Sequence, residues 1–79
     1  MPNMNYEEVQ FTVEQELGTL PSKGRWKKKV RFIKWGDRQT EAKLDIRPWS
    51  NDDSQWGKGL TFTRDELIEL KKILDSVEL

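Results

Sequence analysis

Apolar and polar residues alternate along three stretches of the chain, the pattern expected of half-buried β-strands. The stretches are residues 9–17 (VQFTVEQEL), 26–35 (WKKKVRFIKW) and 43–49 (KLDIRPW). A shorter apolar run at residues 58–62 (KGLTF) indicates a fourth strand. Glycine, proline and polar turn residues separate these runs, and the short connections favour an antiparallel meander.

The period of the pattern becomes helical near the C-terminus. Over residues 64–79, leucine, isoleucine and valine recur at spacings of three and four, which predicts a helix with one apolar face. Thr63 and Glu66 fit a capping box at its start. The apolar face can cover the chain's own sheet or meet the same helix of a second copy, and both remain open. The element order predicts an α+β fold, a four-stranded antiparallel β-sheet followed by one C-terminal α-helix.

The second and third predicted strands carry cations and tryptophans on one of their two faces. In the second strand Val30 and Phe32 form the expected core pair, although a bulge near Phe32–Ile33 would change that assignment. The residues that then point to the other face are Lys27, Lys29, Arg31 and Trp35. In the third strand Leu44 and Ile46 form the apolar side, which we expect to hold the helix. The residues opposite them are Lys43, Arg47 and Trp49. We expect this second face of the sheet to be open to solvent.

The composition excludes several kinds of chemistry. The chain has 79 residues, the length of one domain, and contains no cysteine and no histidine. Disulfides, thiolate catalysis, zinc sites of the usual ligand types and histidine acid–base catalysis are therefore excluded. Acidic turn residues such as Asp52 and Asp53 are typical of solvated or capping groups rather than of a catalytic or magnesium site. The GKG at residues 57–59 lacks the spacing of a phosphate-binding P-loop. We expect neither enzymatic activity nor a cofactor.

Hydropathy gives no sign of a membrane or secretory segment. No apolar run approaches the roughly 20 residues that a membrane-spanning helix needs. The first ten residues, MPNMNYEEVQ, are polar and acidic, unlike a secretory signal. We therefore expect a cytoplasmic protein without a membrane partner, with a single domain over residues 1–79 and disorder in residues 1–5. Because so small a domain is marginally stable alone, oligomerisation is an expected source of further stability.

Charge is concentrated in one segment although the formal net charge is zero. Residues 1–20 hold four glutamates and no cation, whereas residues 21–35 hold seven lysines and arginines and no acid. Either the acidic segment pairs with the basic one across a hairpin, or the basic residues form a surface for a partner. Trp26 fits a core or a surface position equally. Trp56 lies in a polar loop, from which it can fold over the sheet or contact a ligand.

Cations beside exposed aromatic rings are typical of surfaces that bind single-stranded nucleic acid. The cations follow the phosphates, and the rings stack on unpaired bases. Each of the four tryptophans has a lysine or arginine within two positions. The residues therefore favour a nucleic-acid-binding surface on the second sheet face. An RNA-binding module and a protein–protein interaction module are the alternatives.

Three features resemble the positive cofactor 4 family of transcriptional coactivators, and especially its short bacterial relatives. They are the KLDIRPW run, the GKGLT run at residues 57–61 and the terminal amphipathic helix. The match covers about residues 26–75, and the DIR tripeptide at residues 45–47, followed by an aromatic residue, is its most specific part. The resemblance implies a strongly curved sheet, a homodimer paired through its C-terminal helices and a single-stranded DNA ligand.

The resemblance also assigns roles to individual residues. It implies that Arg47 contacts the phosphate backbone and that Trp35 and Trp49 stack on bases, whereas Asp45 either orients Arg47 or joins a neighbouring cationic pair. The regulatory tail of the eukaryotic members has no counterpart here. The expected function is sequence-independent binding of single-stranded DNA by a homodimer, in transcription regulation or in DNA replication or repair. The complete expected site is Lys27, Lys28, Lys29, Arg31, Trp35, Lys43, Arg47, Trp49 and Lys58.

Overall fold

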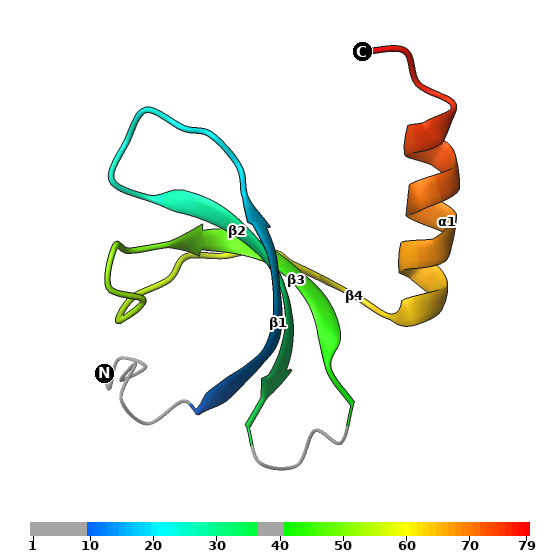
Figure 1. Cartoon of the computed structure of the whole chain (residues 1–79). Coiled ribbons are helices and arrows are strands. Elements are labelled where there is room, and N and C mark those ends of the chain that lie inside the picture. The colour runs from blue at the N-terminus through cyan, green and yellow to red at the C-terminus, as the bar shows by residue number, and fades with distance from the viewer. Residues whose placement is uncertain (1–9, 37–40) are drawn as a thin grey trace.

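A computed structural model describes residues 10–36 and 41–79, and over these residues the chain forms one curved sheet and one helix (Figure 1). The elements are β1 (Phe11–Thr19), β2 (Lys27–Trp35), β3 (Lys43–Trp49), β4 (Leu60–Phe62) and α1 (Arg64–Asp75). The strands are antiparallel neighbours in the order β1-β2-β3-β4. The predicted fold class is therefore confirmed. The expected disorder of residues 1–5 concerns a segment outside the described residues.

The ends of α1 follow from local capping. Thr63 Oγ1 accepts a hydrogen bond from the Glu66 amide at 3.2 Å, and Glu66 Oε1 accepts one from the Thr63 amide at 2.9 Å. The predicted capping box is thus confirmed. The helix ends at Asp75 rather than at residue 79. There the Ser76 hydroxyl and amide both donate to the carbonyl of Ile73, which satisfies a carbonyl that would otherwise lack a partner.

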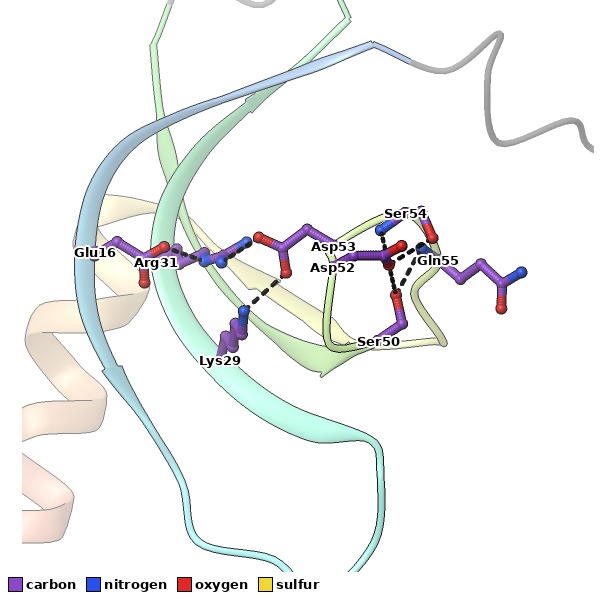
Figure 2. Close-up of polar contacts among 8 residues, drawn as sticks. All are labelled: Glu16, Lys29, Arg31, Ser50, Asp52, Asp53, Ser54 and Gln55. Atoms are coloured by element: carbon purple, nitrogen blue, oxygen red, sulfur yellow. Dashed lines mark hydrogen bonds and ion pairs between the residues drawn. The ribbon is translucent and has the colours of Figure 1, made fainter.

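The register between β2 and β3 is regular, whereas β1 is irregular. Register shifts in β1 fall between Val13 and Gln15, opposite Ile33 and Phe32, and between Glu16 and Gly18. The irregularity near Phe32–Ile33 is thus in the partner strand, and the alternation along β2 is preserved. Extra residues in one strand bend it and increase its twist. The sheet accordingly curves strongly, with one concave and one convex face (Figures 1 and 2).

The most buried residues lie mainly on the concave face. The concave face is formed by Lys27, Lys29, Arg31, Ile33 and Trp35 of β2 and by Lys43, Asp45, Arg47 and Trp49 of β3. The convex face is formed by Val30, Phe32, Leu44, Ile46, Leu60 and Phe62. The buried residues are Arg31, Ile33, Leu44, Asp45 and Trp49, and of these only Leu44 belongs to the convex face. Val30 and Phe32 are half-buried, so the expectation that they form the core pair is wrong. Curvature closes the face that was expected to be open.

Helix α1 stands beside the sheet without covering it (Figure 1). None of its twelve residues, all within the described part of the chain, is buried. The expectation that Leu44 and Ile46 hold the helix against the sheet is therefore wrong for the single chain. The exposed apolar side chains of this region are Leu60, Ile68, Ile73, Leu74, Val77 and Leu79. Within the described residues, no helix is long and apolar enough to cross a membrane.

Candidate nucleic-acid interface

The strand register brings seven of the nine predicted site residues together on the concave face. Lys29 lies opposite Arg47, Lys27 lies opposite Trp49, and Arg31 lies opposite the buried Asp45. The seven are Lys27, Lys29, Arg31, Trp35, Lys43, Arg47 and Trp49. The other two lie elsewhere and are exposed: Lys28 on the opposite side of β2, and Lys58 in the segment before β4.

Asp45 is the centre of a fully paired polar network in the concave face. Its carboxylate is fully buried and accepts hydrogen bonds from Arg47 Nε at 2.7 Å, from Trp35 Nε1 at 3.1 Å and from Thr61 Oγ1 at 3.2 Å. Arg47 Nη2 lies 2.6 Å from the same carboxylate. The Arg47 guanidinium also lies over the Trp35 ring, 4.5 Å from its centroid. Of the two roles left open by the sequence, Asp45 therefore has the first, because it orients Arg47.

Four aromatic rings pack against one another beside this network. Trp35, Trp49, Trp56 and Phe11 have centroid separations between 5.0 and 6.1 Å. Trp56 reaches the cluster because its loop returns to β3, where it forms a bridge with Trp49. Trp49 is 0% exposed, and Trp35 is half-buried. The expected exposure of Trp49 is therefore wrong, while its stacking on a base stays a prediction.

Arg31 and Lys29 share one carboxylate from a distant loop (Figure 2). Arg31 Nη2 lies 2.8 Å from Asp53 Oδ2, and Lys29 Nζ lies 2.8 Å from Asp53 Oδ1. Glu16 of β1 approaches Arg31 from the other side, with its Oε2 2.8 Å from Nε. Burial raises the pKa of Asp53, but hydrogen bonds from Lys29 and Arg31 and their charges outweigh it, so the pKa lies below its usual value.

Asp53 is presented by a compact loop, residues 50–55. Asp52 accepts hydrogen bonds from the Ser50 hydroxyl and from the amide and hydroxyl of Ser54, at 2.7–3.0 Å. These bonds, led by that of the Ser54 hydroxyl, lower the pKa of Asp52 to about 2. Ser50 and Gln55 close the loop with bonds of 2.9 and 3.1 Å. The interpretation of these acids as capping or solvated groups is thus confirmed for Asp52 and wrong for Asp53.

Pairing across the hairpin, the first explanation of the basic segment, holds for part of it, while a partner for the rest stays a prediction. Arg31 pairs with Glu16 and Lys34 pairs with Glu14, so acids of β1 do neutralise cations of β2. Lys29 pairs with Asp53 instead. Among the described residues, the other four cations of residues 21–35 form no ion pair: Lys23, Arg25, Lys27 and Lys28. The unpaired positive charge is therefore concentrated at one end of the β1–β2 hairpin.

Trp26 lies among these unpaired cations, and its side chain is 44% exposed. It separates two surface hollows, one of about 350 Å³ shared with Arg25 and one of about 400 Å³ shared with Lys28. The Ser22 hydroxyl donates to the Trp26 carbonyl at 2.8 Å, and Lys27 Nζ donates to the Ser22 carbonyl at 2.8 Å. Trp26 is thus a surface residue on an ordered loop, the second of the two positions that the sequence allowed.

Asp53 and Phe11 are residues of this candidate interface that the sequence did not identify, whereas Glu16 belongs to the acidic segment that was expected to pair across the hairpin. Phe11 follows the strand alternation, but nothing local indicates that it meets three tryptophans. Asp53 is 22 positions from Arg31 along the chain, so the pairing becomes visible only when the loop is folded. The excess of cations in residues 21–35, which hold no acid, is the sequence signal that carboxylates from other segments neutralise β2. Among the described residues, no group of acids is arranged to hold a metal ion.

Comparison with known proteins gives a family relationship. No family model matches the chain. A protein of Treponema pallidum (strain Nichols), named as an uncharacterized protein, is 38% identical over 74 residues, which cover 92% of this chain and 85% of that protein. At this identity and coverage, the chain belongs to the same family as the Treponema pallidum protein.

Proposed function

We propose that the protein binds single-stranded DNA without sequence specificity, as a homodimer, through the concave face and the basic end of the β1–β2 hairpin. One observation carries this proposal: β2 and β3 align cations and indole rings on a single curved face. Phosphates need cations and unpaired bases need aromatic rings, and both kinds of side chain occur here on one face of the sheet. Transcription, replication and repair are the processes that expose such a strand.

The hairpin end is where a strand first meets the protein. Arg25 and Lys28 are exposed, without an ion pair among the described residues, and flank the exposed ring of Trp26. Unpaired surface cations attract a polyanion over about 10 Å at 0.1 M salt. The paired cations of the concave face contribute only after their carboxylates are displaced. Encounter at the hairpin followed by entry onto the concave face is the order that this charge distribution supports.

Two copies of the chain are proposed to pair through α1 and the convex face. Leu60 is 64% exposed, Ile73 is 59% exposed, and Phe62, Leu70 and Ile73 line an apolar hollow of about 410 Å³. A second copy offers the same apolar surface, and a twofold arrangement buries both at once. Such pairing also provides the stability that a domain of this size lacks alone.

Titration with oligo-dT, followed by tryptophan fluorescence and by molecular mass in solution, tests the function. The expected result is quenching at low salt, with affinity falling by a log–log slope of about 0.7 for each phosphate contact. An Arg25→Ala/Lys28→Ala variant should show a shallower slope, while Lys71→Ala on the exposed side of α1 should match the unmodified protein. An unchanged spectrum at low salt would reject the proposal. Tighter binding of oligo-U than of oligo-dT would favour RNA as the ligand.

A further inference from the structure

We propose that Lys29 and Arg31 form a phosphate site whose place is held by the carboxylate of Asp53. A DNA strand enters the concave face by displacing Asp53 together with the loop of residues 50–55. The inference rests on the proposed function and deepens it, because it names which contact the strand replaces. It also explains how a face on which Lys29 and Arg31 are already paired can bind a polyanion.

The geometry at Asp53 is that of an anion held by two cations. Each carboxylate oxygen takes one partner, Oδ1 from Lys29 Nζ and Oδ2 from Arg31 Nη2, both at 2.8 Å (Figure 2). A phosphodiester likewise presents two anionic oxygens, and charge-assisted bonds to lysine and arginine are the ordinary way in which proteins hold it. The Asp53 side chain is 34% exposed, so a competing anion in solution can reach the pair.

The concave face contains buried hydrogen-bond donors without acceptors, which points to a ligand rich in acceptors. Arg31 is 2% exposed and Trp49 is 0% exposed. Within the described residues, Arg31 Nη1 and Trp49 Nε1 have no hydrogen-bond partner, and Arg31 Nε is close to Glu16 without being aligned for a hydrogen bond. Buried donors without acceptors destabilise the arrangement that contains them. Phosphate oxygens and the carbonyl oxygens of bases supply these acceptors, whereas an apolar or cationic ligand does not.

The loop is built to move without unfolding. Its hydrogen bonds join Ser50, Asp52, Ser54 and Gln55 to one another, so they are retained when the loop shifts as a unit. The ion pairs of Asp53 are its side-chain bonds to β2. The next two residues fix the end of the loop to β3. Trp56 forms a bridge with Trp49, and the Gly57 amide donates to the Pro48 carbonyl at 3.0 Å. Movement is therefore confined to residues 50–55.

An Asp53→Asn variant tests the displacement with little structural change. Asp53 has φ of 63°, a left-handed conformation that asparagine tolerates as well as aspartate, and the two side chains have the same shape. Removing the competing charge should tighten oligo-dT binding about 3- to 10-fold at low salt, a range that corresponds to the loss of one or two weak ion pairs as competitors. Asp75→Asn, which removes one charge at the far end of α1, is the matched control and should leave the affinity unchanged.

A second variant separates a vacated site from a simple change in net charge. In the Asp53→Asn background, Lys29→Ala should abolish the gain, because the freed cation is what receives the phosphate. If the gain persists without Lys29, or if Asp53→Asn binds oligo-dT no more tightly than the unmodified protein does, the inference is overturned while the proposed function stands.

The indole Nε1–H resonance of Trp49 gives a second readout, which is measured both without and with DNA. The Nε1–H signal should shift in Asp53→Asn alone, and in the same direction when oligo-dT is added to the unmodified protein. An Nε1–H signal unmoved by DNA that binds would also overturn the inference. Failure of every variant to bind oligo-dT at low salt would instead reject the proposed function, and the inference with it.

Discussion

The two faces of the sheet differ in burial, and the difference is the reverse of what hydropathy alone predicts. The concave face carries charged and aromatic side chains, yet Arg31, Asp45 and Trp49 are almost completely buried there. The convex face is apolar, yet Phe32 is only half-buried and Leu60 is 64% exposed. The difference shows that curvature and ion pairing can close a polar face within one chain. The apolar face, which has no such ion pairs, stays partly exposed in the single chain.

Asp45→Ala should break the concave face and have the largest effect on stability. The substitution removes the carboxylate that accepts hydrogen bonds from Arg47, Trp35 and Thr61, and with it the charge that balances the Arg47 guanidinium. Removal of one member of a buried pair costs about 3–5 kcal/mol, which is most of the stability of a small domain. Urea unfolding measures the loss. Asp45→Asn keeps the shape of the side chain and one acceptor oxygen and should cost less, and equal losses would show that the network depends on the charge of the carboxylate rather than on packing.

Gly59→Ala should have the second-largest effect, because Gly59 lies just before β4, where the chain closely approaches Ile46 and Arg47 of β3. A Cβ atom at residue 59 would overlap the Arg47 side chain and the Ile46 carbonyl oxygen. Overpacking against backbone costs about 1–3 kcal/mol. The control is Gly18→Ala in β1, where an added Cβ meets nothing within 4 Å and the change should stay within about 0.5 kcal/mol. Similar unfolding midpoints for both variants would refute the close approach.

The sequence predicts which residues share a face, because strand side chains alternate with a period of two and the β2–β3 register is regular. It also predicts the capping box of Thr63 and Glu66, because that interaction spans three residues. These are local properties of the backbone, and they account for the fold class and for the grouping of the candidate site.

The sequence does not predict which face closes, because closure depends on contacts between distant segments. The irregularities of β1 bend the sheet, and the loop of residues 50–55 returns to place Asp53 on Lys29 and Arg31. Neither event leaves a periodic signal. The position of α1 is unpredictable for the opposite reason, since no surface within residues 10–36 and 41–79 buries its apolar side chains.

Replacing Ile73 and Leu74 with serine should impair the assembly of two copies, which we expect to depend on the apolar side of the molecule and not on the concave face. Both side chains are more than half exposed, so their loss costs the single chain little. If two copies pair through α1, the variant should have half the mass of the unmodified protein in light scattering at the same concentration. Lys71→Ser, on the same helix, should leave the mass unchanged. An unmodified protein that is already monomeric would contradict the dimer.

Lowering the pH should reduce the stability of the folded protein, and we expect this to be the smallest of these effects. The pKa of Asp52 is lowered to about 2 and that of Asp53 is also lowered. A carboxyl group with a depressed pKa in the folded state contributes stability that is complete above the unfolded value, about 3.9, and is lost as the pH falls through the folded value. The urea midpoint should therefore fall between about pH 4 and pH 2. Because part of that fall comes from Asp53, Asp53→Asn should show a smaller decrease over this range than the unmodified protein does. Asp75→Asn, at a position that forms no ion pair with the residues that the structure describes, should show the full decrease. Identical acid profiles for all three proteins would mean that the ion pairs of Asp53 do not help to hold the concave face closed.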